Sequence, residues 1–528
     1  QEVRQALQLT DKQLMQDKIE VPAYRMLYLD ETLQENAMME VIRDVSFASR
    51  IEKLQNPDFE KEYVPDSLKG ILREYQKAGA AWIGMLYSNR FGGILADDMG
   101  LGKTLQVISF LLTEHTGCSL IVCPASLVYN WKHELERFAP SLKADMVTGN
   151  VQQRKEVLDR WKEVDVLITS YDLLRRDITD YQELHFFCEV IDEAQYIKNH
   201  GTQAARAVKQ VQTGFRLALT GTPIENRLSE LWSIFDYLMP GYLYSYQRFR
   251  IELEQPIVQH KDEDAAKRLQ RLIRPFVLRR LKKEVLQDLP DKLEENLYAD
   301  MDGEQQELYD AHVRRMKLML EEKSDEEIRT DKIEILAELT RLRQLCCDPA
   351  LLYDNYKGGS AKTELVRGLI RNAVENGHKV LLFSQFTTML ERLYRILEEE
   401  KIASHMLTGA TPKEKRIEMV ESFAHDDVPV FCISLKAGGT GLNLTAADVV
   451  IHFDPWWNSA VQNQATDRAH RIGQKNVVNV YRILAKGTIE EKIVELQERK
   501  LQLSDRILGG ESLQAQGLTR EELLELLR

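Results

Sequence analysis

A glycine-bearing loop between a short apolar run and a helical pattern is the clearest chemical feature of the sequence. The run at 94–96 leads into Asp97-Asp98-Met99-Gly100-Leu101-Gly102-Lys103-Thr104, and we expect a helix from 105 to 112. In such a loop, backbone N–H groups surround phosphate oxygens, helped by the amino end of the helix. Lys103 can reach the β- and γ-phosphates of a nucleotide, and the Thr104 hydroxyl can bind Mg²⁺. The general pattern begins with Gly, where Asp97 stands here.

Two neighbouring carboxylates at the end of another apolar run are the expected partner of this loop. Asp192 and Glu193 follow the run at 190–191. Adjacent carboxylates repel each other, and a metal cation relieves that repulsion. We therefore predict that Asp192 holds Mg²⁺, directly or through water, and that Glu193 polarises the attacking water. An exposed acidic turn without chemistry is the alternative interpretation.

Short apolar runs that alternate with helical periodicity must position these residues. Between 66 and 240 the runs lie at 93–96, 120–123, 166–168, 190–191 and 217–219. A second series, from about 362 to 500, lies at 380–383, 430–433, 449–451 and 477–480. Buried parallel strands of an α/β layer fold have this pattern. The sequence therefore predicts an α/β fold with two parallel-sheet lobes.

The other segments have a helical composition, and strand signals vanish from about 241 to 350. We expect a domain order of 1–65 (helical N-terminal extension or tail of an upstream domain), 66–240 (lobe one), 241–357 (helical protrusions and linker), 358–500 (lobe two) and 501–528 (C-terminal helical segment). Gly358-Gly359-Ser360 is typical of a flexible joint. Because the first residue is Gln1 and no signal-peptide pattern follows, we expect a piece of a longer protein.

The composition excludes several classes of protein. The 528 residues are 44% hydrophobic and 29% charged, which is typical of a soluble globular protein and not of a disordered or collagen-like chain. No stretch approaches the roughly 20 apolar residues that span a bilayer. The six cysteines lack CxxC spacing, which favours buried free thiols in a reducing compartment over structural zinc. The net charge of −13 argues only weakly against nucleic acid, since a duplex responds to a local basic face.

One segment, 267–284, is strongly basic, with the sequence KRLQRLIRPFVLRRLKKE. We predict that it contacts nucleic-acid phosphates or anchors the two lobes, with Arg279, Arg280, Lys282 and Lys283 as its candidate residues. A solvated helix face paired with the acidic residues at 262–264 is the alternative.

Several motifs together resemble one family. Lobe one contains Leu72-Arg73-Glu74-Tyr75-Gln76, LADDMGLGKT (95–104), Asp192-Glu193-Ala194-Gln195 and LTGTP (219–223), and lobe two contains AGGTGLNL (437–444) and RAHRIGQ (468–474). The chain resembles the Swi/Snf-like family of helicase-superfamily-two ATPases, the motors of chromatin remodellers and their bacterial relatives. GLGKT alone would fit many NTPases, whereas the combination over about 66–500 is specific.

The resemblance implies two RecA-like lobes with the ATP site split between them. It implies that Gln76 reads adenine, since its amide can donate and accept, and that Gly441 lies near the ribose and γ-phosphate. Arg468 and Arg471 would be arginine fingers on the γ-phosphate, with a surface salt-bridge helix as the alternative. Gln195 stands where the family commonly has His, and it can hydrogen-bond across the cleft without acting as a cation. Hydrolysis would then require lobe closure.

The resemblance also implies what the chain acts on: ATP with Mg²⁺, and double-stranded DNA along which it translocates without strand separation, remodelling protein–DNA complexes. The further candidates for nucleic-acid contact are Ser126, Trp131, Thr222, Lys436 and Trp457. A packed core position is an equal alternative for Trp457. Two other functions stay open: an RNA-directed helicase or RNA-polymerase-remodelling ATPase, and a scaffold that binds nucleotide without hydrolysing it.

The expected setting follows from the same resemblance. We expect a monomeric motor that binds no membrane and meets DNA-bound proteins or RNA polymerase. The compact segment between the lobes favours a bacterial member, which would be cytoplasmic and nucleoid-associated, whereas a eukaryotic one would be nuclear.

Overall fold

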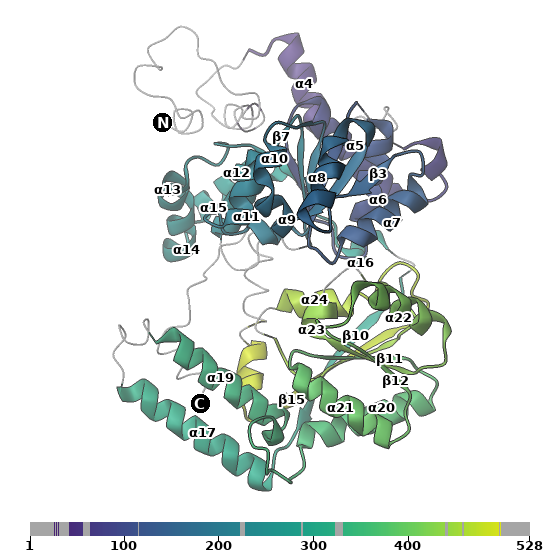
Figure 1. The fold of residues 1–528 in the computed structure, drawn as a ribbon. Helices are drawn as coiled ribbons and strands as arrows, with labels where there is room; N and C mark the ends of the chain where they lie inside the picture. The colour runs from purple at the N-terminus through teal and green to yellow at the C-terminus, as the bar shows by residue number, and fades with distance from the viewer. Residues whose placement is uncertain are drawn as a thin grey trace. The chain divides into compact units, whose positions relative to one another are not determined.

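The protein consists of two compact units, each built on a parallel sheet (Figure 1). This computed structural model describes residues 26, 28, 30, 42–55, 64–114, 116–221, 228–286, 289–322, 331–438, 442–456, 459–495 and 497. Within these residues, the chain passes from unit one to unit two between Val285 and Leu286. The prediction of an α/β fold with two parallel-sheet lobes is confirmed.

Unit one has a seven-stranded sheet in the order β3-β4-β2-β6-β8-β1-β9, and all its pairs are parallel. Its strands are β1 (Gly93–Leu95), β2 (Ser119–Cys123), β3 (Ala144–Met146), β4 (Val166–Ser170), β6 (Glu189–Ile191), β8 (Arg216–Leu219) and β9 (Val277–Leu278). Strands β1, β2, β4 and β6 are buried along their whole length, as expected of a parallel sheet covered on both faces. A separate small sheet pairs β5 (His185–Phe186) with β7 (Gln212–Thr213).

Helices connect these strands and cover the sheet. They are α4 (Val45–Gln55), α5 (Glu74–Ser88), α6 (Lys103–Thr113), α7 (Val128–Phe138), α8 (Val151–Asp159), α9 (Tyr171–Arg176), α10 (Ile178–Tyr181), α11 (Gln203–Gln210), α12 (Leu228–Leu238), α13 (Tyr246–Phe249), α14 (Gln255–His260), α15 (Glu263–Ile273) and α16 (Lys282–Val285). Phe249, Ile257 and Leu269 belong to the same hydrophobic core as the strands. The helices α13 to α15 are therefore part of unit one.

Unit two has a six-stranded parallel sheet in the order β10-β15-β14-β11-β13-β12. Its strands are β10 (Lys292–Ala299), β11 (Val380–Ser384), β12 (Ser404–Leu407), β13 (Val430–Ser434), β14 (Val449–His452) and β15 (Val478–Ala485). Its helices are α17 (Gly303–Glu322), α19 (Lys332–Cys347), α20 (Ala361–Glu375), α21 (Thr387–Glu399), α22 (Lys413–His425), α23 (Leu435–Gly438) and α24 (Ser459–Thr466). The long helices α17 and α19 lie side by side (Figure 1).

The stretch from 241 to 350 is not purely helical, so this prediction was wrong in detail. Strand β9 pairs with β1 in unit one, and β10 pairs with β15 in unit two. Strand β10 is an edge strand with half of its residues exposed, and it begins with the charged stretch Lys292-Leu293-Glu294-Glu295. Strand β9 is only two residues long and is followed by Arg279 and Arg280, so both strands lie beside charged residues that give their segments a helical, polar composition.

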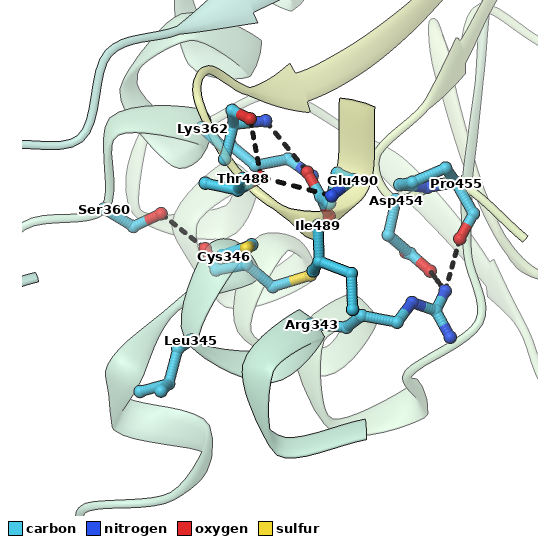
Figure 2. A network of polar contacts seen from close by, with 12 residues as sticks. Arg343, Leu345, Cys346, Ser360, Lys362, Asp454, Pro455, Thr488, Ile489 and Glu490 are labelled. Carbon is cyan, nitrogen blue, oxygen red and sulfur yellow. Dashed lines mark hydrogen bonds and ion pairs between the residues drawn. The ribbon is translucent and has the colours of Figure 1, made fainter. Parts of the chain in front are cut away.

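A buried ion pair joins helix α20 to the chain that follows β15 (Figure 2). Lys362 Nζ lies 2.9 Å from both carboxylate oxygens of Glu490, and both side chains are fully buried. The backbone N–H of Ala485 donates to the same carboxylate at 2.8 Å. Buried charges are tolerated only when such partners satisfy them, so the pair fixes these segments against each other.

A second contact in the same view joins α19 to the end of β14 (Figure 2). Arg343 donates to the Pro455 carbonyl, and its Nη2 lies 3.8 Å from Asp454 Oδ2. Ser384 Oγ donates to Asp454 Oδ1 at 2.6 Å. Burial raises the pKa of Asp454. The carboxyl ends of β11 and β14 are thus held to α19.

All six cysteines are buried free thiols, as the sequence predicted. In the part of the chain that the structure describes, no helix is long and apolar enough to cross a membrane. Among the same residues, His, Cys, Asp and Glu side chains form no group of three or more that could hold a metal ion.

Candidate nucleotide-binding and hydrolysis site

The phosphate-binding loop has the strand–loop–helix context that the sequence predicted, from β1 to the first residue of α6, Lys103. Gly100 and Gly102 have φ angles of 84° and 76°, in the left-handed region that disfavours other residues. A Cβ atom at Gly102 would lie 2.4 Å from Gln76 Nε2. The loop therefore takes this shape because glycine stands at these two positions.

Lys103 and Gln76 bind the loop's own backbone. Lys103 Nζ donates to the Asp97 carbonyl at 2.5 Å. Gln76 is only 3% exposed, donates to the Leu101 carbonyl at 3.0 Å and accepts from the Arg73 N–H at 2.9 Å. Gln76 thus ties α5 to the loop, and its contact with adenine stays a prediction.

The predicted acidic pair follows β6 directly. Glu193 has a φ of 52°, a left-handed conformation that is uncommon for a residue other than Gly and that clusters at functional sites. Its Oε2 accepts from Gln195 Nε2 at 2.7 Å, and Gln195 Oε1 accepts from Thr220 Oγ1 at 3.1 Å. Since Thr220 follows β8, this chain of hydrogen bonds runs from β8 to the Glu193 carboxylate.

Asp192 is held from two sides by aromatic residues. Trp131 Nε1 donates to Asp192 Oδ2 at 2.9 Å, and the Tyr171 hydroxyl donates to the Asp192 carbonyl at 2.8 Å. Burial raises the pKa of Tyr171 well above its usual value, so its hydroxyl stays protonated and keeps donating. Trp131 is 1% exposed. The predicted nucleic-acid contact of Trp131 is therefore wrong, because its ring lies in the core and its N–H is used by Asp192.

The two halves of the site lie at one edge of the sheet. Strand β8 separates β1 from β6, and adjacent strands are about 4.8 Å apart, which sets the two ends at roughly 10 Å. The loop after β8 approaches the phosphate-binding loop, since a Cβ at Gly221 would lie 3.3 Å from Met99 Cγ. The carboxyl edge of such a sheet is where ligands bind. Unit one therefore brings Lys103, Thr104, Asp192, Glu193 and Gln195 to the same edge.

The donors at this edge fit Mg²⁺. Mg²⁺ takes oxygen ligands, keeps several waters, and is held by one or two carboxylates together with substrate phosphates. Thr104 offers a hydroxyl and Asp192 a carboxylate. Asp192 Oδ1 accepts the Glu193 N–H at 2.8 Å and Oδ2 accepts from Trp131, so the carboxylate is held in a fixed orientation, and a carboxylate oxygen can accept more than one partner. These two residues would hold the ion.

The RAHRIGQ stretch forms a braced segment of unit two. The Arg468 carbonyl accepts from the Leu444 N–H at 3.0 Å, and Gln474 Nε2 donates to the Ala447 carbonyl at 2.8 Å. His470 Nε2 donates to the Pro290 carbonyl at 2.8 Å. Arg468 is 9% exposed and Arg471 is half-buried. The finger roles of Arg468 and Arg471 stay predictions.

The other nucleic-acid candidates occupy varied positions. Ser126 is half-buried in the loop after β2. Thr222, Gly441 and Trp457 lie outside the described residues, and Lys436 belongs to α23 without a described side chain. In the basic run, Lys283 is exposed, Arg279 is half-buried and Lys282 is buried.

Arg280 departs most clearly from the prediction of a phosphate contact. Its side chain is 14% exposed and pairs with Asp97, a residue with 0% exposure. It points into unit one, toward the phosphate-binding loop. The ion pair with Asp97 engages the guanidinium and disfavours a DNA contact for Arg280, and sequence reasoning missed this partner.

Replacing Trp131 with Phe should lower kcat/KM for Mg-ATP by about 5- to 100-fold. Phe keeps an aromatic ring in the core, although a smaller one, and Asp192 would lose a hydrogen bond, which costs about 1–3 kcal/mol when the remaining partner is left unsatisfied. Steady-state ATPase rates at several Mg²⁺ concentrations measure this. Trp232→Phe is the matched control, since the Trp232 N–H donates to the backbone carbonyls of Leu243 and Tyr244 and not to Asp192. Equal losses in both variants would contradict a specific role for Trp131.

Comparison with family models gives three matches that together cover most of the chain. The SNF2-related domain matches residues 75–351, and the helicase conserved C-terminal domain matches 361–473. A third model, described as bacterial SNF2 helicase associated, matches 1–65.

Curated relatives come from bacteria and eukaryotes. The chain is 40% identical over 479 residues to the putative ATP-dependent helicase/translocase YwqA of Bacillus subtilis, covering 88% of this chain and 51% of that protein. It is 41% identical over 464 residues to an uncharacterized ATP-dependent helicase of Mycoplasma genitalium, covering 86% and 44%. It is 33% identical over 552 residues to the TATA-binding protein-associated factor MOT1 of Saccharomyces cerevisiae, covering 90% and 30%. The chain thus spans about half or less of the length of these relatives.

Among solved structures, the Sulfolobus solfataricus SWI2/SNF2 ATPase core in complex with dsDNA is 37% identical to this chain. The match has a TM-score of 0.43 and covers 83% of this chain and 93% of that one.

Proposed function

Because the chain belongs to the SNF2-related family of ATP-dependent helicases, we propose that it hydrolyses ATP and uses the energy to translocate along double-stranded DNA and remodel protein–DNA complexes. The proposal of hydrolysis rests on one observation: Lys103, Asp192 and Glu193 lie at the same edge of the unit-one sheet. The translocase activity that the Bacillus relative's name states, and the DNA in the Sulfolobus structure's description, belong to those proteins. The name of the Bacillus relative supports a translocase here, and the DNA substrate is part of the proposal.

The hydrolytic step assigns a role to each residue of unit one. Lys103 lies at the amino end of α6, where it exchanges its bond to the Asp97 carbonyl for the β- and γ-phosphates of ATP. Glu193 orients the attacking water, and Gln195 holds its carboxylate in place. Thr104 and Asp192 would hold Mg²⁺, which would neutralise negative charge on the phosphates. In this proposal Arg468 and Arg471 supply positive charge to the γ-phosphate.

The proposed DNA contacts are Ser126, Thr222, Arg279, Lys283, Lys436 and Trp457. Hydroxyls, backbone N–H groups and cations of this kind grip phosphates without reading bases. We therefore expect the protein to bind DNA with little preference for base sequence.

Duplex DNA should stimulate ATP turnover more than single-stranded RNA does. Phosphate contacts release counterions, so the logarithm of the binding constant should fall with the logarithm of salt concentration by about 0.9 for each contact. ATP turnover with no nucleic acid, with duplex DNA and with single-stranded RNA, each at several salt concentrations, tests this. Stronger stimulation by RNA would instead support an RNA-directed helicase, and stimulation only by RNA polymerase would support an ATPase that remodels that enzyme.

The cellular setting is also a proposal. The match of residues 1–65 to a model described as bacterial and the identity to bacterial helicases favour a bacterial protein. We therefore propose a monomeric, nucleoid-associated motor that meets DNA-bound proteins or RNA polymerase.

A further inference from the structure

The segment 277–282, which we name the loop clamp, runs alongside the first residues of the phosphate-binding loop. The Ala96 N–H donates to the Leu278 carbonyl at 2.7 Å, and the Asp98 N–H donates to the Arg280 carbonyl at 3.0 Å. The Lys282 N–H then donates to Asp98 Oδ2 at 2.9 Å. The clamp therefore continues the β1–β9 pairing beyond the strands and into the loop itself.

The Arg280 side chain adds a two-point ion pair to this backbone pairing. Its Nε donates to Asp97 Oδ1 at 2.9 Å and its Nη2 to Asp97 Oδ2 at 2.5 Å. Nη2 also donates to Gln106 Oε1 at 2.7 Å, and Nη1 donates to the Tyr75 carbonyl. The guanidinium lies over the Tyr75 ring, 5.2 Å from its centroid. Arg280 thus holds α5, α6 and the loop at once.

Gln106 and Gly79 complete the surroundings of this ion pair. Gln106 Nε2 donates to Asp97 Oδ2 at 3.1 Å, so both carboxylate oxygens have partners. A Cβ atom at Gly79 would lie 1.7 Å from Gln106 Oε1 and 2.8 Å from Arg280 Nη2. Helix α5 approaches the pair this closely because residue 79 is glycine. The site is built from four elements around one buried carboxylate.

We propose that Arg280 is a positioning residue for ATP, acting through Asp97 and Lys103. Asp97 is the first residue of the loop, and its carbonyl is where Lys103 Nζ is held. Fixing the Asp97 side chain therefore fixes both the loop backbone and the resting place of the phosphate-binding lysine. The clamp leads into helix α16 (Lys282–Val285), after which the chain enters unit two at Leu286. This inference rests on the proposed function, since it assumes that the loop binds ATP.

The test is the ATP affinity of an Arg280→Met protein, measured by direct nucleotide titration and by steady-state kinetics. Without the guanidinium, Asp97 is left buried without a cation, and the loop must rearrange to rehydrate it. We expect Kd and KM for ATP to rise about tenfold or more, since losing one partner of a buried pair is costly. The kcat at saturating ATP should change by less than about threefold, because Arg280 touches no reacting atom.

A double variant separates positioning from general damage. In Asp97→Asn/Arg280→Met both charges are gone, so much of the ATP affinity should return relative to Arg280→Met alone. Arg154 and Asp177 form a matched pair elsewhere in unit one, with Nε 2.6 Å from Oδ2 and side chains 7% and 11% exposed. Arg154→Met should lower the melting temperature to a similar extent and leave Kd for ATP unchanged.

Should Arg280→Met fail to fold, Arg280→Lys keeps the charge but loses the two-point geometry, and it should raise Kd for ATP without a large change in melting temperature. Unchanged ATP affinity in the folded variant, or a double variant no better than the single one, would overturn the proposal. Weaker DNA binding with unchanged ATP affinity would overturn it too and return Arg280 to the DNA contacts. Failure of the proposed function would look different: the unaltered protein would not bind or hydrolyse ATP.

Discussion

Replacing Glu193 with Gln should lower ATP turnover by about 10²–10⁴-fold, the range that a positioned general base contributes. Gln has nearly the same shape but cannot take a proton from water. The new amide oxygen can still accept the hydrogen bond that Gln195 donates to Glu193 Oε2 at 2.7 Å. ATP affinity should be almost unchanged, because the phosphates bind the loop and Lys103. Turnover by phosphate release and ATP affinity by titration measure the two effects separately.

The control for Glu193 is Glu183, an exposed residue of the same unit. Glu183→Gln removes the same charge and should leave turnover and affinity unchanged. Near-normal turnover in Glu193→Gln would remove this residue from the role of activating water. Loss of ATP affinity without loss of the maximal rate would instead make Glu193 a binding residue.

Replacing Arg468 with Ala should lower the maximal rate by about 10³–10⁵-fold, the contribution of an arginine finger in other NTPases. A finger stabilises charge that develops only in the transition state, so ATP affinity should fall far less than the rate. Arg468→Lys should recover a small part of the rate, since a single ammonium replaces a planar fork. Single-turnover kinetics with saturating DNA and ATP resolve the chemical step.

The burial of Arg468 determines which controls the Arg468→Ala variant needs. Arg468 is 9% exposed, so its removal also opens space between the segments that its backbone joins. Thermal melting and DNA binding must therefore be unchanged before a lost rate counts as a lost finger. Arg395→Ala, at an exposed position on α21, should change none of these properties. Full activity of Arg468→Ala would show that this side chain does not reach the nucleotide during hydrolysis.

The sequence could predict the parts of the site that are local in the chain. The phosphate-binding loop is one strand, one loop and one helix in succession, and the acidic pair directly follows its strand. Their partners are distant in sequence: Trp131 binds Asp192 across 61 positions, and Arg280 binds Asp97 across 183. Nothing in the type or spacing of these residues indicates such pairs, because the fold alone brings them together. The sequence alone therefore predicts DNA contacts for Trp131 and Arg280 and gives no sign of their partners within unit one.

The same reasoning explains which strands could be predicted. Central strands such as β2 and β11 are buried on both faces and therefore have continuous apolar runs. The strands that the sequence did not reveal, β3, β9, β10 and β12, are the outermost members of the two sheets. An edge strand pairs on one side only and can expose polar residues, so its sequence resembles that of a loop or a charged helix.

The pairing of β10 with β15 has a consequence for how the protein is synthesised. Lys292 lies opposite Val478, and the pairing continues over all eight residues of both strands. During synthesis, β10 therefore cannot pair with β15 until nearly the whole of unit two has been translated. Unit one finishes its sheet with β9, at Leu278, so it can fold while the remainder emerges. Nascent unit two would carry an unpaired strand edge for most of that time, and pairings so distant in sequence form slowly. The second unit is thus the part of this chain with the greater need for chaperones.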